Sequence, residues 1–316
     1  KASEAFAIMA DVVMHPKFAD EELDRARQET LDGLMVSMRQ PGSVGQRTMT
    51  RALYGDTPYG GVTTEATIEA IAPSDLERFH RLNWRLDNAV LVIAGNVTPD
   101  EGFALAEQAF GRWVPPASAP PRPVTFTPPS TPPRAITVDI PAIGQASVGL
   151  GRIGPSRLAD DYVEAAVATA VLGTGYSSRL NSEIRIKRGL SYGAGASLPA
   201  RKLPAPLVGG AQTRNDAVPQ VIDLLVSEFS RLGQEPIEAK ELAARKAYVI
   251  GSFGRSVETT SGLAGQYSAL AQFGLPLTRL QTYSSEIEAV TAEQAGAAAR
   301  KYWDPASATL VVVGDA

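Results

Sequence analysis

The sequence contains no cysteine in its 316 residues and only two histidines, His15 and His80. The absence of cysteine excludes disulfide bonds, a thiolate nucleophile and a cysteine-bound metal in this chain. Basic residues do not outnumber acidic ones, and the net charge of −4 argues against a nucleic-acid-binding protein, which would show a strong basic excess. No apolar run reaches the roughly 18 residues of a membrane-spanning helix. We therefore predict no nucleic-acid partner and no membrane span.

What the sequence does contain is an internal repeat. When the stretch that begins at Ile68 is shifted by 219 positions, it falls without a gap on the end of the chain, so that Ile68 meets Ile287 and Trp84 meets Trp303. The match could also arise by chance between two unrelated helix–strand units. Because the same offset also aligns Leu23 with a leucine much earlier in the chain, we favour an internal duplication.

Each copy predicts a helix followed by a strand. In the first copy Ser74 is a suitable N-cap, and apolar side chains follow it at helical spacing. The run "NAVLVIAG" at 88–95 then predicts a short apolar strand. A helix from Thr98 to about Trp113 is expected next, with Phe103 on its buried face.

A proline-rich stretch separates the two copies. The segment "VPPASAPPRPVTFTPPSTPPR" contains nine prolines, which predict a stiff, extended linker. The predicted organisation is therefore the second half of an N-terminal unit in residues 1–115, a linker in 116–134 and a C-terminal unit in 135–316.

The second unit carries a segment that the first one lacks. Residues 135–219 precede the repeat and predict several strands with helices between them, which indicates an α+β unit with a largely antiparallel sheet. The first unit has no counterpart of this segment. We therefore expect it to have an open sheet edge and an uncovered helix face, which another chain or a missing first part would complete.

Several motifs carry a resemblance to one family. The stretch "LGTGYSSRLNSEIRIKRGLSYGAGAS" resembles the signature of the C-terminal domain of the M16 zinc peptidases, the pitrilysin, insulinase and mitochondrial processing peptidase group. The stretches "FADEELDRARQETLDGL", "LYGDTPYGGVTT" and "DLERFHRLNWRLDNAVLVIAGNV" are similar, in order, to the second half of that family's N-terminal domain. The resemblance implies an α+β fold of duplicated M16-type units, with mainly antiparallel sheets and helices packed on one side, that close around an extended peptide. It also suggests a periplasmic location, because related bacterial proteins are often exported.

The same resemblance raises the question of zinc. In that family, an inverted H-x-x-E-H helix and a later glutamate bind the metal. This chain has no H-x-x-E-H. His15 precedes a proline at the predicted end of a helix, where it would interact with the helix dipole. His80 is expected to be an ordinary surface or boundary residue.

The family's glutamate ligand also lacks a clear equivalent. Alignment with the family pattern places Gly33 at that position, with Asp32 beside it, and a shift of one helical turn would place Glu29 there instead. The simpler interpretation of Glu29 is a solvated charge beside Arg25 and Arg27. We expect no catalytic residue and no metal in this chain alone, and zinc in the complete enzyme or in a partner chain.

Arg185 and Tyr192 are the candidate substrate-binding residues. The resemblance implies this role, because in active M16 peptidases an arginine and a tyrosine with this spacing reach the substrate. A guanidinium offers a fixed fork of donors to a peptide carbonyl, and a phenol can donate to an oxyanion. The alternative is an arginine paired with Glu183 or with solvent, and a tyrosine that merely begins a strand.

Two functions stay open on the sequence. The first is the substrate-binding part of an M16 metallopeptidase. It would act on extended peptides together with a zinc-bearing half, or in a homo- or heterodimer with an M16 zinc subunit. The second is a catalytically inactive structural or interaction subunit on the same fold.

Overall fold

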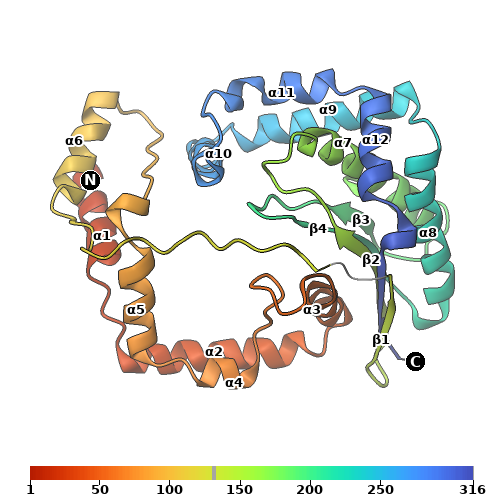
Figure 1. The fold of residues 1–316 in the computed structure, drawn as a ribbon, viewed down its shortest axis with the longest axis horizontal. Helices are drawn as coiled ribbons and strands as arrows, with labels where there is room; N and C mark the ends of the chain where they lie inside the picture. The colour runs from red at the N-terminus through yellow and green to blue at the C-terminus, as the bar shows by residue number, and fades with distance from the viewer. Residues whose placement is uncertain (130–132, 316) are drawn as a thin grey trace. The chain divides into compact units, whose positions relative to one another are not determined.

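The computed structural model describes residues 1–129 and 133–315, and Figure 1 shows their path. The helices are α1 (Ala2–Met14), α2 (Asp20–Ser37), α3 (Pro41–Tyr54), α4 (Glu65–Glu69), α5 (Pro73–Asn83), α6 (Pro99–Phe110), α7 (Tyr162–Gly173), α8 (Val218–Gln234), α9 (Ala239–Ser256), α10 (Thr260–Phe273), α11 (Arg279–Ala289) and α12 (Ala292–Tyr302). The strands are β1 (Ala135–Asp139), β2 (Ala146–Ile153), β3 (Ala194–Ser197), β4 (Pro206–Thr213) and β5 (Thr309–Gly314). None of the helices in these residues is long and apolar enough to cross a membrane.

Contacts divide the chain into two compact units that are not continuous in sequence. The first unit comprises Lys1–Leu34, Thr63–Val124 and Ser256–Leu280. The second unit comprises Met35–Val62, Thr125–Arg255 and Gln281–Ala316.

The internal repeat is confirmed by the element bounds. A shift of 219 positions carries α2 onto α9, α3 onto α10 and α5 onto α12, and the first and last residues of each pair coincide. The short 3₁₀ turn at Leu86–Asn88 likewise falls on the one at Pro305–Ser307. The two copies therefore share helix positions as well as sequence.

The sheet of the second unit has the strand order β1-β5-β2-β4-β3. β1 runs parallel to β5, whereas β2 pairs antiparallel with both β5 and β4, and β3 pairs antiparallel with β4. The predicted α+β fold with a mainly antiparallel sheet is thus confirmed. β5, the last strand in the sequence, lies between β1 and β2 and is hydrogen-bonded on both edges.

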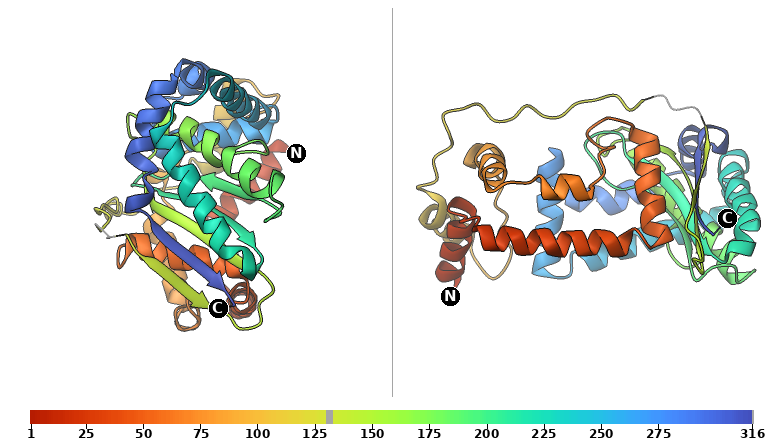
Figure 2. Two further views of the ribbon diagram at one scale, coloured as in Figure 1. Left: turned by 90° about the vertical axis from the view of Figure 1, so that its right-hand side faces the viewer. Right: turned by 90° about the horizontal axis from the view of Figure 1, so that it is seen from below.

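Both faces of this sheet are covered. Leu310 and Val312 of β5 pack with the core beneath α7, α8 and α12, whereas Val311 and Val313 pack against α3 on the opposite face. Figure 1 shows these helices on the two sides of the sheet, and Figure 2 gives further views of the same layers. The sequence predicted helices on one face of the sheet. It did not predict that α3, a helix from the first repeat, covers the other face.

The packing of α3 explains why it belongs with the second unit. Met49, Leu53 and Tyr54 are buried against the sheet. The Tyr54 hydroxyl donates a hydrogen bond of 2.8 Å to the carbonyl oxygen of Pro204, and burial raises the pKa of this phenol. A side chain at Gly151 would collide with Met49, so this glycine lets the helix approach the strand closely.

The strand predicted at 88–95 is wrong. Residues 89–94 have no strand pairing, although they align with Ala308–Val313, whose last five residues form most of β5. The reason is the absence of neighbours: β5 is flanked by β1 and β2, whereas no strand among the described residues pairs with 89–94. An apolar run becomes a strand only when other strands complete its backbone hydrogen bonds.

The remaining helices of the first unit pack less tightly than their counterparts. α1 contacts α6, and His80 Nε2 on α5 lies 2.7 Å from the carbonyl oxygen of Val13 on α1. Phe103 on α6 is exposed, so its predicted burial is wrong. The described part of the linker predicted at 116–134 contains no helix or strand. Residues 130–132 of that linker lie outside the described residues.

Candidate functional site

The motif around Arg185 begins where α7 ends at Gly173. The next glycine, Gly175, has a φ of 88°, and a side chain there would collide with the ring of Tyr248 on α9. Both the backbone conformation and the lack of space therefore require glycine at this turn.

Buried polar side chains hold this turn in place. Asn181, which is buried, donates a hydrogen bond of 2.5 Å to the carbonyl oxygen of Tyr176 and accepts one of 3.3 Å from the backbone of Ala194 in β3. Arg245 on α9 donates to the carbonyl oxygen of Thr174 at 3.3 Å. Because these groups satisfy the backbone of the turn, the turn is fixed to both α9 and β3.

Arg185 lies in a π-helical turn, Asn181–Ile186. The N–H of Lys187 bonds to the carbonyl of Ser182 at 2.9 Å, five residues back, which is the π-helical pattern. Gly189, with a φ of 62°, then ends the turn. The N–H of Gly189 bonds to the carbonyl of Arg185 at 2.9 Å, which is the 5→1 bond of an αL cap, and the N–H of Leu190 returns to the carbonyl of Ile184 at 2.9 Å. The chain reverses here and brings Tyr192 back beside Arg185.

Arg185 lies between two tyrosines in the sequence, and its guanidinium is close to both of their rings in space. Its Cζ atom is 4.8 Å from the ring centre of Tyr192 and 5.2 Å from that of Tyr176. Both distances are within the range of cation–π attraction. Tyr192 is 90% exposed and Tyr176 is 64% exposed, so the cluster opens to solvent. We call Tyr176, Arg185 and Tyr192 the Arg185 cluster.

Charge around the Arg185 cluster is not balanced by a neighbouring acid. Glu183 pairs with Lys187 and Arg188, and the hydrogen bond from Lys187, followed by that from Arg188, holds the pKa of Glu183 below its usual value. The alternative pairing of Arg185 with Glu183 is therefore wrong. Within residues 1–129 and 133–315, no side chain or backbone group makes a hydrogen bond or ion pair with the Arg185 guanidinium.

A family model matches more than half of the chain, including the part that contains the Arg185 cluster. The model described as "Peptidase M16 inactive domain" covers residues 70–249, which include the Arg185 cluster. The chain belongs to this family.

Curated relatives agree with that assignment. An uncharacterized zinc protease of Mycobacterium leprae is 31% identical over 198 residues, which are 61% of this chain and 44% of that protein. A non-peptidase homolog of Helicobacter pylori is 23% identical over 296 residues, which are 92% of this chain and 67% of that protein. This M16 chain thus spans less than half of the first relative and about two thirds of the second.

Solved structures share the fold over nearly the whole chain. A peptidase M16 inactive domain from Pseudomonas fluorescens has a TM-score of 0.90 at 25% identity, with 99% of this chain and 74% of that one covered. A protease from H. pylori has a TM-score of 0.89 at 20% identity, with 99% and 76% covered. The duplicated M16 fold predicted from the sequence is confirmed.

The residues of this M16 chain do not fit the zinc site of an active member. Among the described residues, no three histidine, aspartate or glutamate side chains gather closely enough to hold a metal ion. His15 Nδ1 lies 3.4 Å from the carboxylate of Asp11 at the exposed end of α1, and His80 contacts the α1 backbone instead of any carboxylate. Zinc chemistry cannot be assigned to this donor set.

The position of the family's glutamate ligand offers no better fit. Gly33 lies on α2, where an added Cβ would meet no atom within 4 Å, so packing does not require glycine there. Glu29 is exposed on the same helix. Arg25 and Arg27 pair with other acids, Glu22 and Asp24, rather than with Glu29.

Sequence reasoning missed Tyr176 as a member of the cluster. Its signal was present in the motif "GTGYSSRL", because a large aromatic residue between a glycine and serines in a tight turn has no core to enter. The spacing between Tyr176 and Arg185 in the sequence did not reveal this contact, because the π-helical turn is what brings the two residues together.

Proposed function

We propose that this chain is a substrate-binding part of an M16-type peptidase, in which the Arg185 cluster contacts an extended peptide. The observation that carries the proposal is the state of Arg185. Its charge lies beside two exposed phenols and has no acidic partner among the described residues. A zinc-bearing half or a partner chain would perform the hydrolysis.

The chemistry of the cluster suits a peptide backbone. Contact with two rings restrains the plane of the guanidinium, while its N–H edge stays available to carbonyl oxygens. The Tyr192 hydroxyl can donate a hydrogen bond to the oxyanion that develops when a peptide carbonyl is attacked. Because the turn beneath the cluster is fixed by Asn181, these donors are positioned before substrate arrives.

The need for a further polypeptide is supported by the first unit. Trp84 is 51% exposed, whereas its repeat equivalent Trp303 is 1% exposed beneath the sheet of the second unit. Val90, in the unpaired stretch 89–94, is also exposed. A segment that adds strands to 89–94 would cover this apolar face. We propose that the zinc-bearing half, or an M16 zinc subunit in a homo- or heterodimer, supplies it.

A second candidate is a catalytically inactive structural or interaction subunit on the M16 fold. Two observations favour it: the matching family model is described as an inactive domain, and the relative from H. pylori is called a non-peptidase homolog. In this case the Arg185 cluster would have no substrate, and the exposed face of the first unit would be the functional surface.

The test separates the two candidates. The chain is mixed with an M16 zinc subunit, and cleavage of unfolded peptides is measured for the natural sequence, Arg185→Ala and Tyr192→Phe. Loss of an oxyanion donor costs about 10²–10³ in rate, so Tyr192→Phe should lower kcat/KM by roughly this factor at most, and Arg185→Ala by at least tenfold. Arg188→Ala, in the same turn but paired with Glu183, is the matched control and should leave kcat/KM nearly unchanged.

Two outcomes would reject the peptidase proposal. Equal kcat/KM for all four proteins would remove the Arg185 cluster from substrate binding. A complex that forms with the zinc subunit but neither binds nor cleaves peptide would establish the structural candidate.

The chain alone should retain no zinc after dialysis. One tightly held zinc per chain by elemental analysis, with chelator-sensitive proteolysis, would show that the chain itself is the zinc-bearing half.

A further inference from the structure

A groove runs between α3 and the sheet of the second unit. Its volume is about 520 Å³, and its lining comes from α3, from β2, β4 and β5, and from the end of β3 with the loop that follows it. The volume is within the range of small-molecule sites. Among the described residues, none of positions 174–192 contributes to the lining, so the groove is separate from the Arg185 cluster.

The groove follows α3 from one end of the helix to the other. At its start, Gln212 on β4 reaches Gly42, where an added Cβ would lie 2.5 Å from Gln212 Nε2. At its end, the hydroxyl of Tyr54 bonds to the carbonyl oxygen of Pro204, which belongs to the same loop as Arg201. A helix rises about 1.5 Å per residue, so these ends are roughly 18 Å apart, a length that about five residues of an extended chain cover.

Neutral polar side chains stand along this length. Ser147 on β2 is paired with Gln212 on β4, and an added Cβ on Gly45 of α3 would lie 3.3 Å from Ser147 Oγ. Five such side chains line the groove and make no hydrogen bond with another group of the described chain: Gln46, Thr50, Ser147, Ser197 and Gln212. Amides and hydroxyls both donate and accept, which matches the N–H and C=O groups of a peptide backbone.

The floor of the groove is bare backbone where two strands meet. Gly149 on β2 is paired with Gly210 on β4. Gly210 has no room for a side chain, because a Cβ would lie 2.4 Å from the carbonyl oxygen of Val148. Gly149 has room, since its Cβ would lie 3.7 Å from Met49 Cε and 3.9 Å from a methyl of Val208. Packing inside the chain therefore does not require glycine at 149, and a strand glycine often marks the close approach of a ligand or of another backbone.

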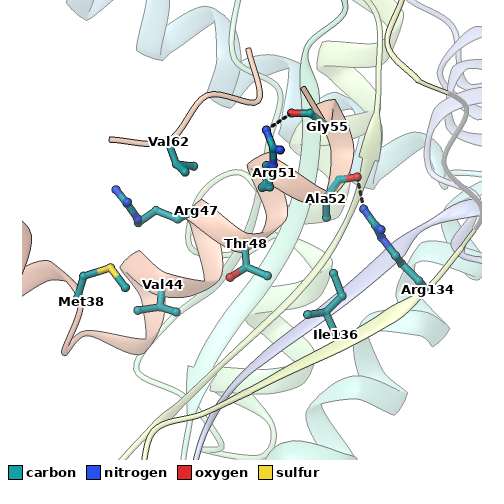
Figure 3. A pocket seen from close by; sticks show the side chains of 10 residues that line it. All are labelled: Met38, Val44, Arg47, Thr48, Arg51, Ala52, Gly55, Val62, Arg134 and Ile136. Atoms are coloured by element: carbon teal, nitrogen blue, oxygen red, sulfur yellow. Dashed lines mark hydrogen bonds between the residues drawn. The ribbon is translucent and has the colours of Figure 1, made fainter. Parts of the chain in front are cut away.

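A single positive charge lies at the far end of the groove. No aspartate or glutamate lines it, and Arg201 makes no ion pair in residues 1–129 and 133–315. The Cζ atom of Arg201 lies 4.9 Å from the ring centre of Tyr59, a contact that leaves the N–H edge of the guanidinium available. Figure 3 shows that Arg51 and Arg134 already bond to the carbonyl oxygens at the end of α3, so Arg201 is not needed to cap this helix.

We propose that this groove binds the carboxyl-terminal end of an extended peptide, with the terminal carboxylate on Arg201. A guanidinium binds a carboxylate through two parallel N–H donors, and one unpaired cation matches one terminal charge. The backbone of the peptide would lie over Gly149 and bond to the neutral side chains along the groove. Met49 and Val208 provide apolar wall for its side chains. The proposal does not rest on the proposed function, because the groove and the Arg185 cluster share no residue.

Isothermal titration of the whole chain with the peptide acetyl-Ala-Leu-Ala-Leu-Ala tests the proposal. The comparison ligands are the same peptide with a carboxyl-terminal amide, which lacks the charge, and acetyl-alanine, which lacks the length. The free acid should bind roughly tenfold or more tightly than the amide, as expected for a hydrogen bond to a charged group, and its affinity should fall as salt is raised. Acetyl-alanine should bind more weakly than the free acid, because it fills only the end of the groove at Arg201.

Three variants separate binding from folding. Arg201→Gln should remove the preference for the free acid, a ratio that a loss of folded protein does not change. Gln46→Ala should weaken both peptides severalfold, whereas Gln220→Ala, at an exposed glutamine of α8 outside the lining, is the matched control and should weaken neither. Gly149→Ala should weaken both peptides without lowering the Tm, because its Cβ fits the strand but takes space from the groove.

Several results would overturn the proposal. These are no binding of the free acid at millimolar concentration, an amide bound as tightly as the acid, and an acid preference that survives Arg201→Gln. Unchanged affinity in both Gln46→Ala and Gly149→Ala would also overturn it. Arg185→Ala should leave the affinity unchanged, and lost affinity in that variant would assign the peptide to the Arg185 cluster instead of the groove.

Discussion

Trp84 and Trp303 occupy matching positions in the two repeats, and replacing each by alanine should have very different effects. Trp303 packs edge-on against Phe229 on α8, with ring centres 4.9 Å apart and planes at 87°. Its Nε1–H has no hydrogen-bond partner among the described residues, so its contribution is packing. Trp84 instead stacks on His80, with ring centres 6.1 Å apart, and has half of its surface in water.

The structure sets the size of each effect. Replacing a fully buried tryptophan by alanine costs about 3–5 kcal/mol. With a urea m-value of about 2 kcal/mol/M, the midpoint of the second unit should fall by roughly 2 M in Trp303→Ala. Trp84 buries about 100 Å² of a side chain of roughly 200 Å², which bounds its loss at about 2.5 kcal/mol. That loss should appear in the first unit only.

Hydrogen–deuterium exchange during a urea titration can assign each effect to a unit. Peptides from α8 and β5 report on the second unit, and peptides from α1 and α5 report on the first. Trp303→Ala should deprotect α8 and β5 at lower urea, whereas Trp84→Ala should leave them unchanged. The reasoning fails if Trp84→Ala lowers the protection of α8 and β5 as much as Trp303→Ala does. A shift of less than about 1 kcal/mol in Trp303→Ala would refute the packing argument itself.

Two further predictions concern the second unit. Asp161 accepts hydrogen bonds from Lys301 at 2.6 Å and Tyr302 at 2.9 Å, and although partial burial raises its pKa, these bonds hold it below the usual value. The resulting stabilisation is present above the unfolded pKa of about 3.9 and is lost as pH falls through the lower folded pKa. Asp161→Asn should therefore lower the Tm at pH near 7, with a difference that disappears in acid; a constant difference at all pH values would contradict this. A Cβ at Gly173 would collide with the backbone nitrogen of Ala196, so Gly173→Ala should displace β3 and lower the Tm, and an unchanged melt by circular dichroism would show that α7 can shift freely.

The helices and the duplication could be predicted because their signals are local or repeated. Helical spacing and the offset of 219 positions identify α5 and α12 from the sequence alone, although Ser74, the predicted N-cap, lies inside α5, whose N-cap is Ala72. The stretch 88–95 shows where this reasoning ends. Its apolar pattern is similar to that of β5, but a strand depends on partners elsewhere in the chain, and among the described residues only the second copy has them.

The site was predictable in part for a similar reason. Arg185 and Tyr192 stood out through the motif that contains them, and the structure places them side by side. The contact with Tyr176 depends on a π-helical turn and on the buried hydrogen bonds of Asn181, which no periodicity in the sequence encodes. The contact of Arg134 with the carbonyl oxygen of Ala52 on α3 was also invisible, because the two residues are 82 positions apart in the sequence.

Because α3 lies in the first repeat but packs on the sheet of the second unit, the order of synthesis constrains when the sheet can be completed. The helix that covers one face of the sheet is synthesised before all of its strands, and β5, which lies between β1 and β2, is the last of the five strands to be made. At about 5–20 residues per second, α3 would wait roughly 10–50 s on the ribosome before Val311 and Val313 exist to receive it. During that interval the apolar face of α3 lacks its partners on β5 and the contacts that complete the sheet are long-range, so the second unit can complete its fold only after β5 has been made. Chaperone binding to the nascent chain should therefore be strongest over α3, a helix that looks unremarkable in the finished molecule.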